Sequence, residues 1–91
     1  MTELVVGRIV RAEPHPGARA PSYLLTVDLG GLGTRETTLP ASDHSAQELE
    51  GRQVVCSVDG DDTVVLAAHT HERGLVLLAP EHDVPAGTAV A

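Results

Sequence analysis

The sequence predicts a single all-β domain, and three features of its composition indicate this. The chain has 91 residues, which suffice for one small core and not for two. Its hydrophobic residues, 42% of the chain, are mostly Val, Leu and Ala in short runs, with one Tyr and no Phe or Trp. Nine Gly and six Pro separate these runs, which is typical of short strands joined by turns. Residues 1–91 are therefore expected to form one domain.

The first strand is expected over residues 4–13. Its apolar residues fall on both faces around Gly7, which predicts a long strand that kinks at this glycine and serves two faces of a barrel. Two prolines and a glycine at residues 14–17 then end the strand in a turn.

The clearest strand covers residues 23–29. Apolar and polar side chains alternate along it, so one face belongs to the core and Tyr23 is expected on that face. The glycine-rich residues 30–33 predict a hairpin connection, so residues 34–39 should pair antiparallel with this strand.

Residues 40–51 break the strand rhythm. A short helix is expected over residues 46–49, with Ser42 or Asp43 as its N-cap and Gly51 as its end.

The second half of the chain is expected to return to strands. Alternate residues from Val54 to Val58 face inward on a fourth strand, which stops at Asp59-Gly60. Residues 63–68 and 74–79 are expected to form the fifth strand and a further one, and residues 89–91 a short closing strand.

Two groups of side chains with potential chemistry are interpreted as structural. Cys56, the single cysteine, lies in the apolar run VVCSV and is expected to be a small buried hydrophobe. His69 and His71 would share a face of a strand, which suits a metal ion, but no Cys or carboxylate stands at accompanying ligand spacing. We expect a hairpin tip there, and neither a metal nor a cofactor.

The sequence carries no signature of an enzyme. It lacks a nucleophile elbow, Walker or Rossmann glycines and an isolated carboxylate pair, and a small barrel without large insertions offers little pocket. No signal peptide and no apolar run of membrane-spanning length are present, so a cytoplasmic, non-catalytic protein that does not contact membranes is expected.

Residues 6–30 carry a resemblance to a known family, with the sequence VGRIVRAEPHPGARAPSYLLTVDLG. They resemble the tRNA-binding domain found in some methionyl- and phenylalanyl-tRNA synthetases, in free-standing tRNA-binding proteins and in the CsaA secretion chaperones. The A-R-x-P step before the second strand and the D-x-G step after it look most like CsaA. EGRQVVCSV and LVLLAPEHDVPAGTAV resemble later segments of the same family.

The resemblance implies a five-stranded Greek-key OB-fold (oligonucleotide/oligosaccharide-binding) barrel with one short helix and a C-terminal β extension. In such a barrel the helix between the third and fourth strands plugs the bottom. The resemblance also implies a homodimer, and an apolar face near residues 64–68 is expected to take a partner.

The function that the resemblance implies is binding of tRNA or another structured RNA by shape and backbone contact. A basic patch would comprise Arg8, Arg11, Arg19 and Arg35, of which Arg8, Arg19 and Arg35 are assigned to contact with nucleic acid. The alternative is that these arginines solubilise the surface by pairing with acidic residues. The candidate partners are Glu13, Glu36 and Asp28.

Charge opposes RNA binding. Thirteen Asp and Glu face six Arg and no Lys, a formal charge of −7, and phosphate binding depends on cations. The basic Asn-Pro-Pro-Arg-type loop of the family is replaced by the acidic segment Asp59-Gly60-Asp61-Asp62. Two alternatives therefore stay open: a CsaA-like module that binds unfolded or exported polypeptide through an apolar groove, and a degenerate accessory subunit without RNA binding.

Overall fold

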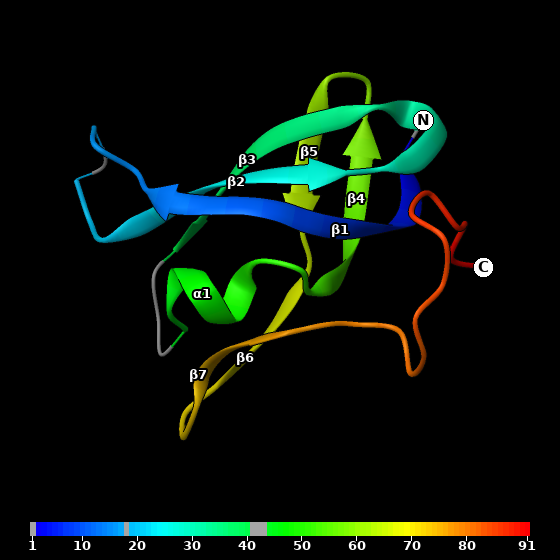
Figure 1. Cartoon of the computed structure of the whole chain (residues 1–91). Helices are drawn as coiled ribbons and strands as arrows, with labels where there is room; N and C mark the ends of the chain where they lie inside the picture. Colours follow the sequence, from blue (N-terminus) through cyan, green and yellow to red (C-terminus); the bar gives the residue numbers. More distant parts are fainter. Residues whose placement is uncertain (1, 18, 41–43) are drawn as a thin grey trace.

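The computed structural model describes residues 2–17, 19–40 and 44–91, which form seven short strands, one helix and one 3-10 turn (Figure 1). The strands are β1 (Glu3–Pro14), β2 (Ser22–Asp28), β3 (Thr34–Pro40), β4 (Gln53–Asp59), β5 (Asp62–Val65), β6 (Ala67–Thr70) and β7 (Gly74–Leu77). The helix is α1 (Ala46–Leu49), and the 3-10 turn is η1 (Gly30–Leu32). None of the described helices has the length and apolar character needed to cross a membrane.

The first five strands form one antiparallel sheet in the order β3-β2-β1-β4-β5. The second half of β1 pairs with β2, and its first half pairs with β4, so this one strand joins both halves of the sheet. The sheet curls until β3 and β5 approach each other (Figure 1). The result is the five-stranded Greek-key OB-fold barrel that the sequence predicts.

Strand β1 is long and serves both halves of the sheet, as predicted, while the kink expected at Gly7 stays a prediction. The register of the β1–β2 ladder shifts between Ile9 and Arg11, which leaves Val10 as the extra residue of a β-bulge. Gly7 allows close packing. A Cβ atom there would lie 2.5 Å from Cγ1 of Val27, so a side chain at this position would collide with the core.

The core fills the inside of the barrel. Its fully buried side chains are Ile9, Leu25, Val27, Leu29, Leu49, Val54 and Cys56. Tyr23 packs against this cluster from the same face of β2, as predicted, and its hydroxyl donates a hydrogen bond to the carbonyl oxygen of His44 at 3.0 Å. The alternation read from the second and fourth strands is thus confirmed.

Helix α1 closes the bottom of the barrel with Leu49, which is fully buried. Its N-cap is Ser45, whose Oγ accepts a hydrogen bond from the Glu48 amide at 3.2 Å. The predicted caps Ser42 and Asp43 lie outside the described residues. Gly51 ends the helical segment as predicted, with a φ of +88° that favours glycine.

Two side chains join the free edges of the barrel. Among the described residues β3 and β5 share no backbone ladder. Instead Oγ1 of Thr37 donates a hydrogen bond to the carbonyl oxygen of Thr63 at 2.7 Å, and Nη1 of Arg35 donates to that of Gly60 at 2.8 Å. We call this junction the β3–β5 seam.

The predicted fifth strand, residues 63–68, is divided at Leu66. The amide of Leu66 donates to the carbonyl oxygen of Val55 at 2.9 Å, but the amide of Val55 donates to the carbonyl oxygen of Leu78 at 2.9 Å. Leu78 therefore bonds to the Val55 amide of β4 in the place that Leu66 would take if the fifth strand continued. The chain leaves the barrel after Leu66 and forms the separate β6–β7 hairpin (Figure 1).

The C-terminal segment lies along the first half of β1. It makes a single β-bridge, between Val5 and Ala89, so the closing strand expected over residues 89–91 was wrong in extent. The turn at residues 85–88 delivers only a short stretch of chain to β1, which limits the pairing. Buried Gln53 anchors the segment: its side-chain amide donates to the carbonyl oxygen of Val84 at 2.6 Å and accepts from the Val84 amide at 3.0 Å.

The seam can be tested with Thr37→Val, which keeps the side-chain shape and removes the hydroxyl. We expect the free energy of unfolding to fall by about 1–2 kcal/mol, because the carbonyl oxygen of Thr63 loses its partner. The matched control is Thr38→Val, since Thr38 is the exposed neighbour on the same strand. Equal effects of the two substitutions in urea denaturation would show that the hydrogen bond does not hold the seam.

Candidate binding surfaces

The ionisable side chains of the described residues form no group that could bind a metal ion. Within residues 2–17, 19–40 and 44–91, no three His, Cys, Asp or Glu side chains are grouped so that they could hold a metal ion. His69 lies in β6 and His71 in the turn after it, so both lie near the tip of the β6–β7 hairpin, as predicted.

Cys56 is fully buried in β4 and belongs to the hydrophobic core, as predicted. Burial raises the pKa of its thiol from 9.0 to about 11. The thiol is therefore protonated at neutral pH, and a protonated thiol is a poor nucleophile and metal ligand.

This pKa shift predicts a loss of stability at alkaline pH. Because the pKa is higher in the folded state, only the unfolded state ionises as the pH rises above 9. The free energy of unfolding should stay level below pH 8 and fall by roughly 2–3 kcal/mol by pH 11. The control is Cys56→Ala, measured over the same pH range in urea. If the variant loses as much stability between pH 8 and 11 as the unsubstituted protein, the buried thiol is not the cause.

Arg8 and Arg35, two of the three arginines assigned to RNA, lie on opposite faces of the sheet. In the cross-strand register Arg8 pairs with Asp28, whereas Arg35 pairs with Val27, the neighbouring residue of β2. Successive residues of a strand point to opposite faces. Strand β2 also lies between β1 and β3, so the two arginines do not lie on adjacent strands.

Both side chains bind the protein itself. Nη1 of Arg8 donates a hydrogen bond to the carbonyl oxygen of Gly51 at 2.7 Å, and Nη2 lies 3.4 Å from Oδ2 of Asp83. Arg35 donates to the carbonyl oxygen of Gly60 across the seam. Arg8 thus ties the turn after α1 and the C-terminal segment to β1, and Arg35 closes the barrel.

Arg11 pairs with an acidic residue, which is the alternative to RNA contact that the sequence left open. Its Nη2 lies 2.9 Å from Oε2 of Glu13, and both side chains are exposed. An ion pair of this kind contributes little to stability.

Arg19 lies in the loop between β1 and β2 and is exposed. It lines a shallow hollow of about 440 Å³ together with His15 and Tyr23. This hollow combines a cation with the edge of an aromatic ring, which are the groups that bind single-stranded or looped nucleic acid.

A second basic hollow was not predicted. His44, Arg52 and Arg73 line a space of about 280 Å³ between the α1 region and the β6–β7 hairpin. These residues come from three segments that no sequence pattern connects. The hairpin brings them together, and the division of the predicted fifth strand at Leu66 positions that hairpin.

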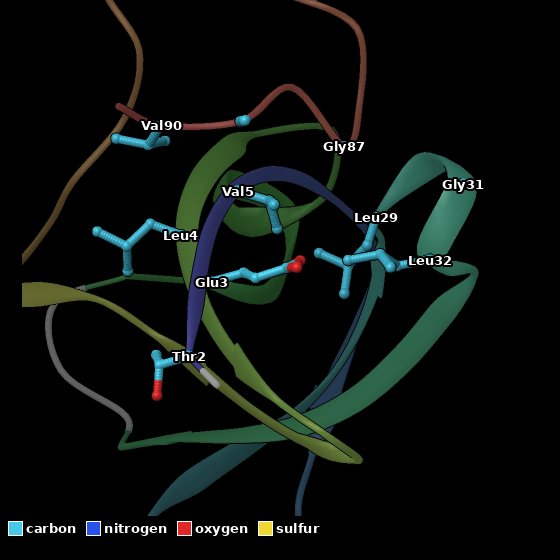
Figure 2. Close-up of a pocket in the computed structure, with 10 residues that line it drawn as sticks. Thr2, Glu3, Leu4, Val5, Leu29, Gly31, Leu32, Gly87 and Val90 are labelled. Carbon is cyan, nitrogen blue, oxygen red and sulfur yellow. The ribbon is translucent and has the colours of Figure 1, made fainter.

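An apolar hollow of about 590 Å³ lies at the end of the barrel that carries the chain termini. Leu4, Leu32 and Val90 line it and remain 37–40% exposed. Figure 2 shows the Glu3 side chain extending across the hollow towards Leu29 and Leu32. Among the described residues its lining contains a carboxylate and no basic side chain, so this surface suits apolar or cationic groups.

The apolar surface continues across the outside of the sheet. Leu4 pairs with Ser57 of β4, and Ser57 pairs with Val64 of β5, so the three side chains form one row. Val64 is 57% exposed. This row is the apolar face expected near residues 64–68.

Comparison with solved structures identifies the architecture. The crystal structure of the chaperone CsaA from Bacillus anthracis str. Ames matches with a TM-score of 0.90 at 26% sequence identity, over 99% of this chain and 91% of that chain. The chain has the CsaA fold. A CsaA chaperone protein from Picrophilus torridus also matches with a TM-score of 0.90, at 22% identity, over 99% of this chain and 92% of that one.

A MetRS-related protein from Pyrococcus horikoshii matches with a TM-score of 0.80 at 23% identity, over 99% of this chain and 90% of that one. No protein-family model matches the chain. The resemblance read from the turns at both ends of the sequence is thus confirmed at the level of structure, over nearly the whole chain.

Proposed function

We propose that this protein is a non-catalytic, cytoplasmic binding module for tRNA or another structured RNA, which it recognises by shape and backbone contact. The likeness to a MetRS-related protein and to the CsaA chaperones supports this proposal, since it gives the chain a barrel of the kind used for binding. The observation that carries it is the distribution of the arginines.

Three arginines have no side-chain partner among the described residues, and none of them lies in the acidic β4–β5 hairpin. Arg19 lies in the β1–β2 loop, Arg52 follows α1, and Arg73 lies in the β6–β7 turn. The turn of the acidic β4–β5 hairpin lies away from both the β1–β2 loop and the β6–β7 hairpin (Figure 1). An acidic protein with this separation can offer one local basic surface to phosphates, although its net charge is −7.

Of the residues that the sequence assigned to RNA, Arg19 is therefore the strongest candidate. Arg8 and Arg35 hold carbonyl oxygens of the protein, and their contact with RNA stays a prediction. Substituting either one would also disturb the fold, so neither separates binding from stability.

RNA binding is tested by fluorescence anisotropy with bulk tRNA over a series of salt concentrations. We expect binding at low salt that weakens steeply as salt rises, and Arg19→Gln should reduce the slope of log K against log salt by about 1. Arg11→Gln is the matched control, because it removes the same charge from an exposed arginine that pairs with Glu13. Absence of tRNA binding by the unsubstituted protein at low salt would refute the proposal.

A second candidate function is polypeptide binding or self-association through the apolar surface, as the likeness to the CsaA chaperones also suggests. Leu4, Val64 and Val90 present exposed apolar side chains on adjoining segments, and monomeric proteins rarely leave such faces uncovered. In this candidate the protein is a homodimer whose groove takes extended chains. Failure to bind either RNA or polypeptide would favour an accessory subunit.

Self-association is tested by sedimentation at micromolar concentration. We expect a dimer that Val64→Asp converts to a monomer, because a carboxylate in an apolar interface loses its hydration without a partner. Val10→Asp is the control, since Val10 is similarly exposed but lies at the bulge of β1. A monomeric unsubstituted protein would exclude the homodimer.

A further inference from the structure

The hollow between the α1 region and the β6–β7 hairpin differs from the other surfaces because it holds two arginines whose side chains have no partner among the described residues. Arg8, Arg11 and Arg35 each bond to a carboxylate or a carbonyl oxygen. The guanidinium groups of Arg52 and Arg73 make no such contact with any residue in the described part of the chain. They also line one hollow together, along with the His44 side chain.

Among the described residues, no carboxylate lines this hollow. Apart from the three basic side chains, its walls are apolar, with Leu75 and Leu77 of β7 among them. Leu75 is buried and belongs to the hydrophobic core. The two arginines lie beside an apolar wall and have no carboxylate partner among the described residues, so an anion that enters the hollow is attracted by both.

The backbone beneath each arginine is fixed. The Arg52 amide donates a hydrogen bond to the carbonyl oxygen of Leu49 at 3.1 Å, and the Arg52 carbonyl oxygen accepts one from the Ile9 amide at 2.9 Å. The Arg73 amide donates to Oγ1 of Thr70 at 2.9 Å within the hairpin turn. Both side chains therefore start from defined positions, which lowers the entropy lost when they close on a ligand.

The chemistry of two guanidinium groups selects the ligand. Each planar guanidinium presents paired N–H donors that match two oxygens of a phosphate, and two of them can hold one tetrahedral oxyanion from two sides. We propose that Arg52 and Arg73 form a binding site for a phosphate group of the RNA backbone. This inference rests on the proposed function, and it gives that function a site outside the residues that the sequence assigned.

The site adjoins the hollow that Arg19 lines. Tyr23 lines the Arg19 hollow, and its hydroxyl donates to the carbonyl oxygen of His44, which lines the Arg52–Arg73 hollow. A single contact thus joins the two hollows.

The test uses Arg52→Gln, Arg73→Gln and the double variant in anisotropy titrations with bulk tRNA. Each single substitution should weaken binding at low salt, and the double variant should lose about tenfold in affinity and about 2 in the slope of log K against log salt. Arg11→Gln, which also lowers the net charge by one, should leave both quantities nearly unchanged. Urea denaturation should give the same stability for all four variants, because none of the substituted side chains supports the core.

A second measurement separates RNA phosphate from free phosphate. Inorganic phosphate should raise the thermal unfolding midpoint of the unsubstituted protein above that in chloride of equal ionic strength, and the double variant should lose this shift. If phosphate gives the shift but tRNA does not bind, the site is real, its ligand is a free phosphate, and the proposed RNA function fails. If tRNA binds equally well to the double variant, the site is refuted while the RNA function stands. If neither tRNA nor phosphate distinguishes the double variant, the inference is overturned.

Discussion

Side-chain hydrogen bonds close this barrel between β3 and β5, where a fully paired barrel would have backbone hydrogen bonds. The edges of β3 and β5 meet through Thr37 and Arg35, which donate hydrogen bonds to the carbonyl oxygens of Thr63 and Gly60. Both side chains face inward in register with buried residues of β2. Closure of the seam therefore uses the Thr37 hydroxyl and the Arg35 guanidinium, and these contacts limit what the same residues can do on the surface.

The limitation matters because basic residues are scarce. With six arginines and no lysine, each cation that holds the fold is unavailable to a ligand. Arg35 closes the seam, and Arg8 ties together β1, the turn after α1 and the C-terminal segment. The arginines without described partners lie elsewhere, at Arg19 and at the Arg52–Arg73 hollow. The proposed phosphate binding is compatible with the charge of −7 because these three arginines have no side-chain partner among the described residues.

Much of the fold could be predicted from local patterns. These patterns depend only on residues that are close together in the sequence. They are the alternation in β2 and β4, the turn residues at both ends of β2 and the glycine after α1, and all of these predictions were confirmed. The bulge at Val10 could not be predicted, because it depends on how β1 shares its length between β2 and β4. The division at Leu66 depends on Leu78, a residue distant in sequence, and therefore left no local signal.

The candidate site was harder to predict than the fold for the same reason. Residue type identifies arginine as a candidate for phosphate contact, but partner choice is decided by distant residues such as Asp83 and Gly60. The sequence directed attention to the first three strands, whereas Arg52 and Arg73 meet only after the β6–β7 hairpin has left the barrel. Which arginines are available is a property of the packed structure.

The most direct test of this account is the NMR spectrum of the six arginine Nε–Hε groups, recorded with and without tRNA. The account predicts that the resonances of Arg52, Arg73 and Arg19 shift on titration, while that of Arg35 stays in place because its guanidinium remains bonded to Gly60. Shifts confined to Arg8 and Arg35, with Arg52 and Arg73 unchanged, would contradict it.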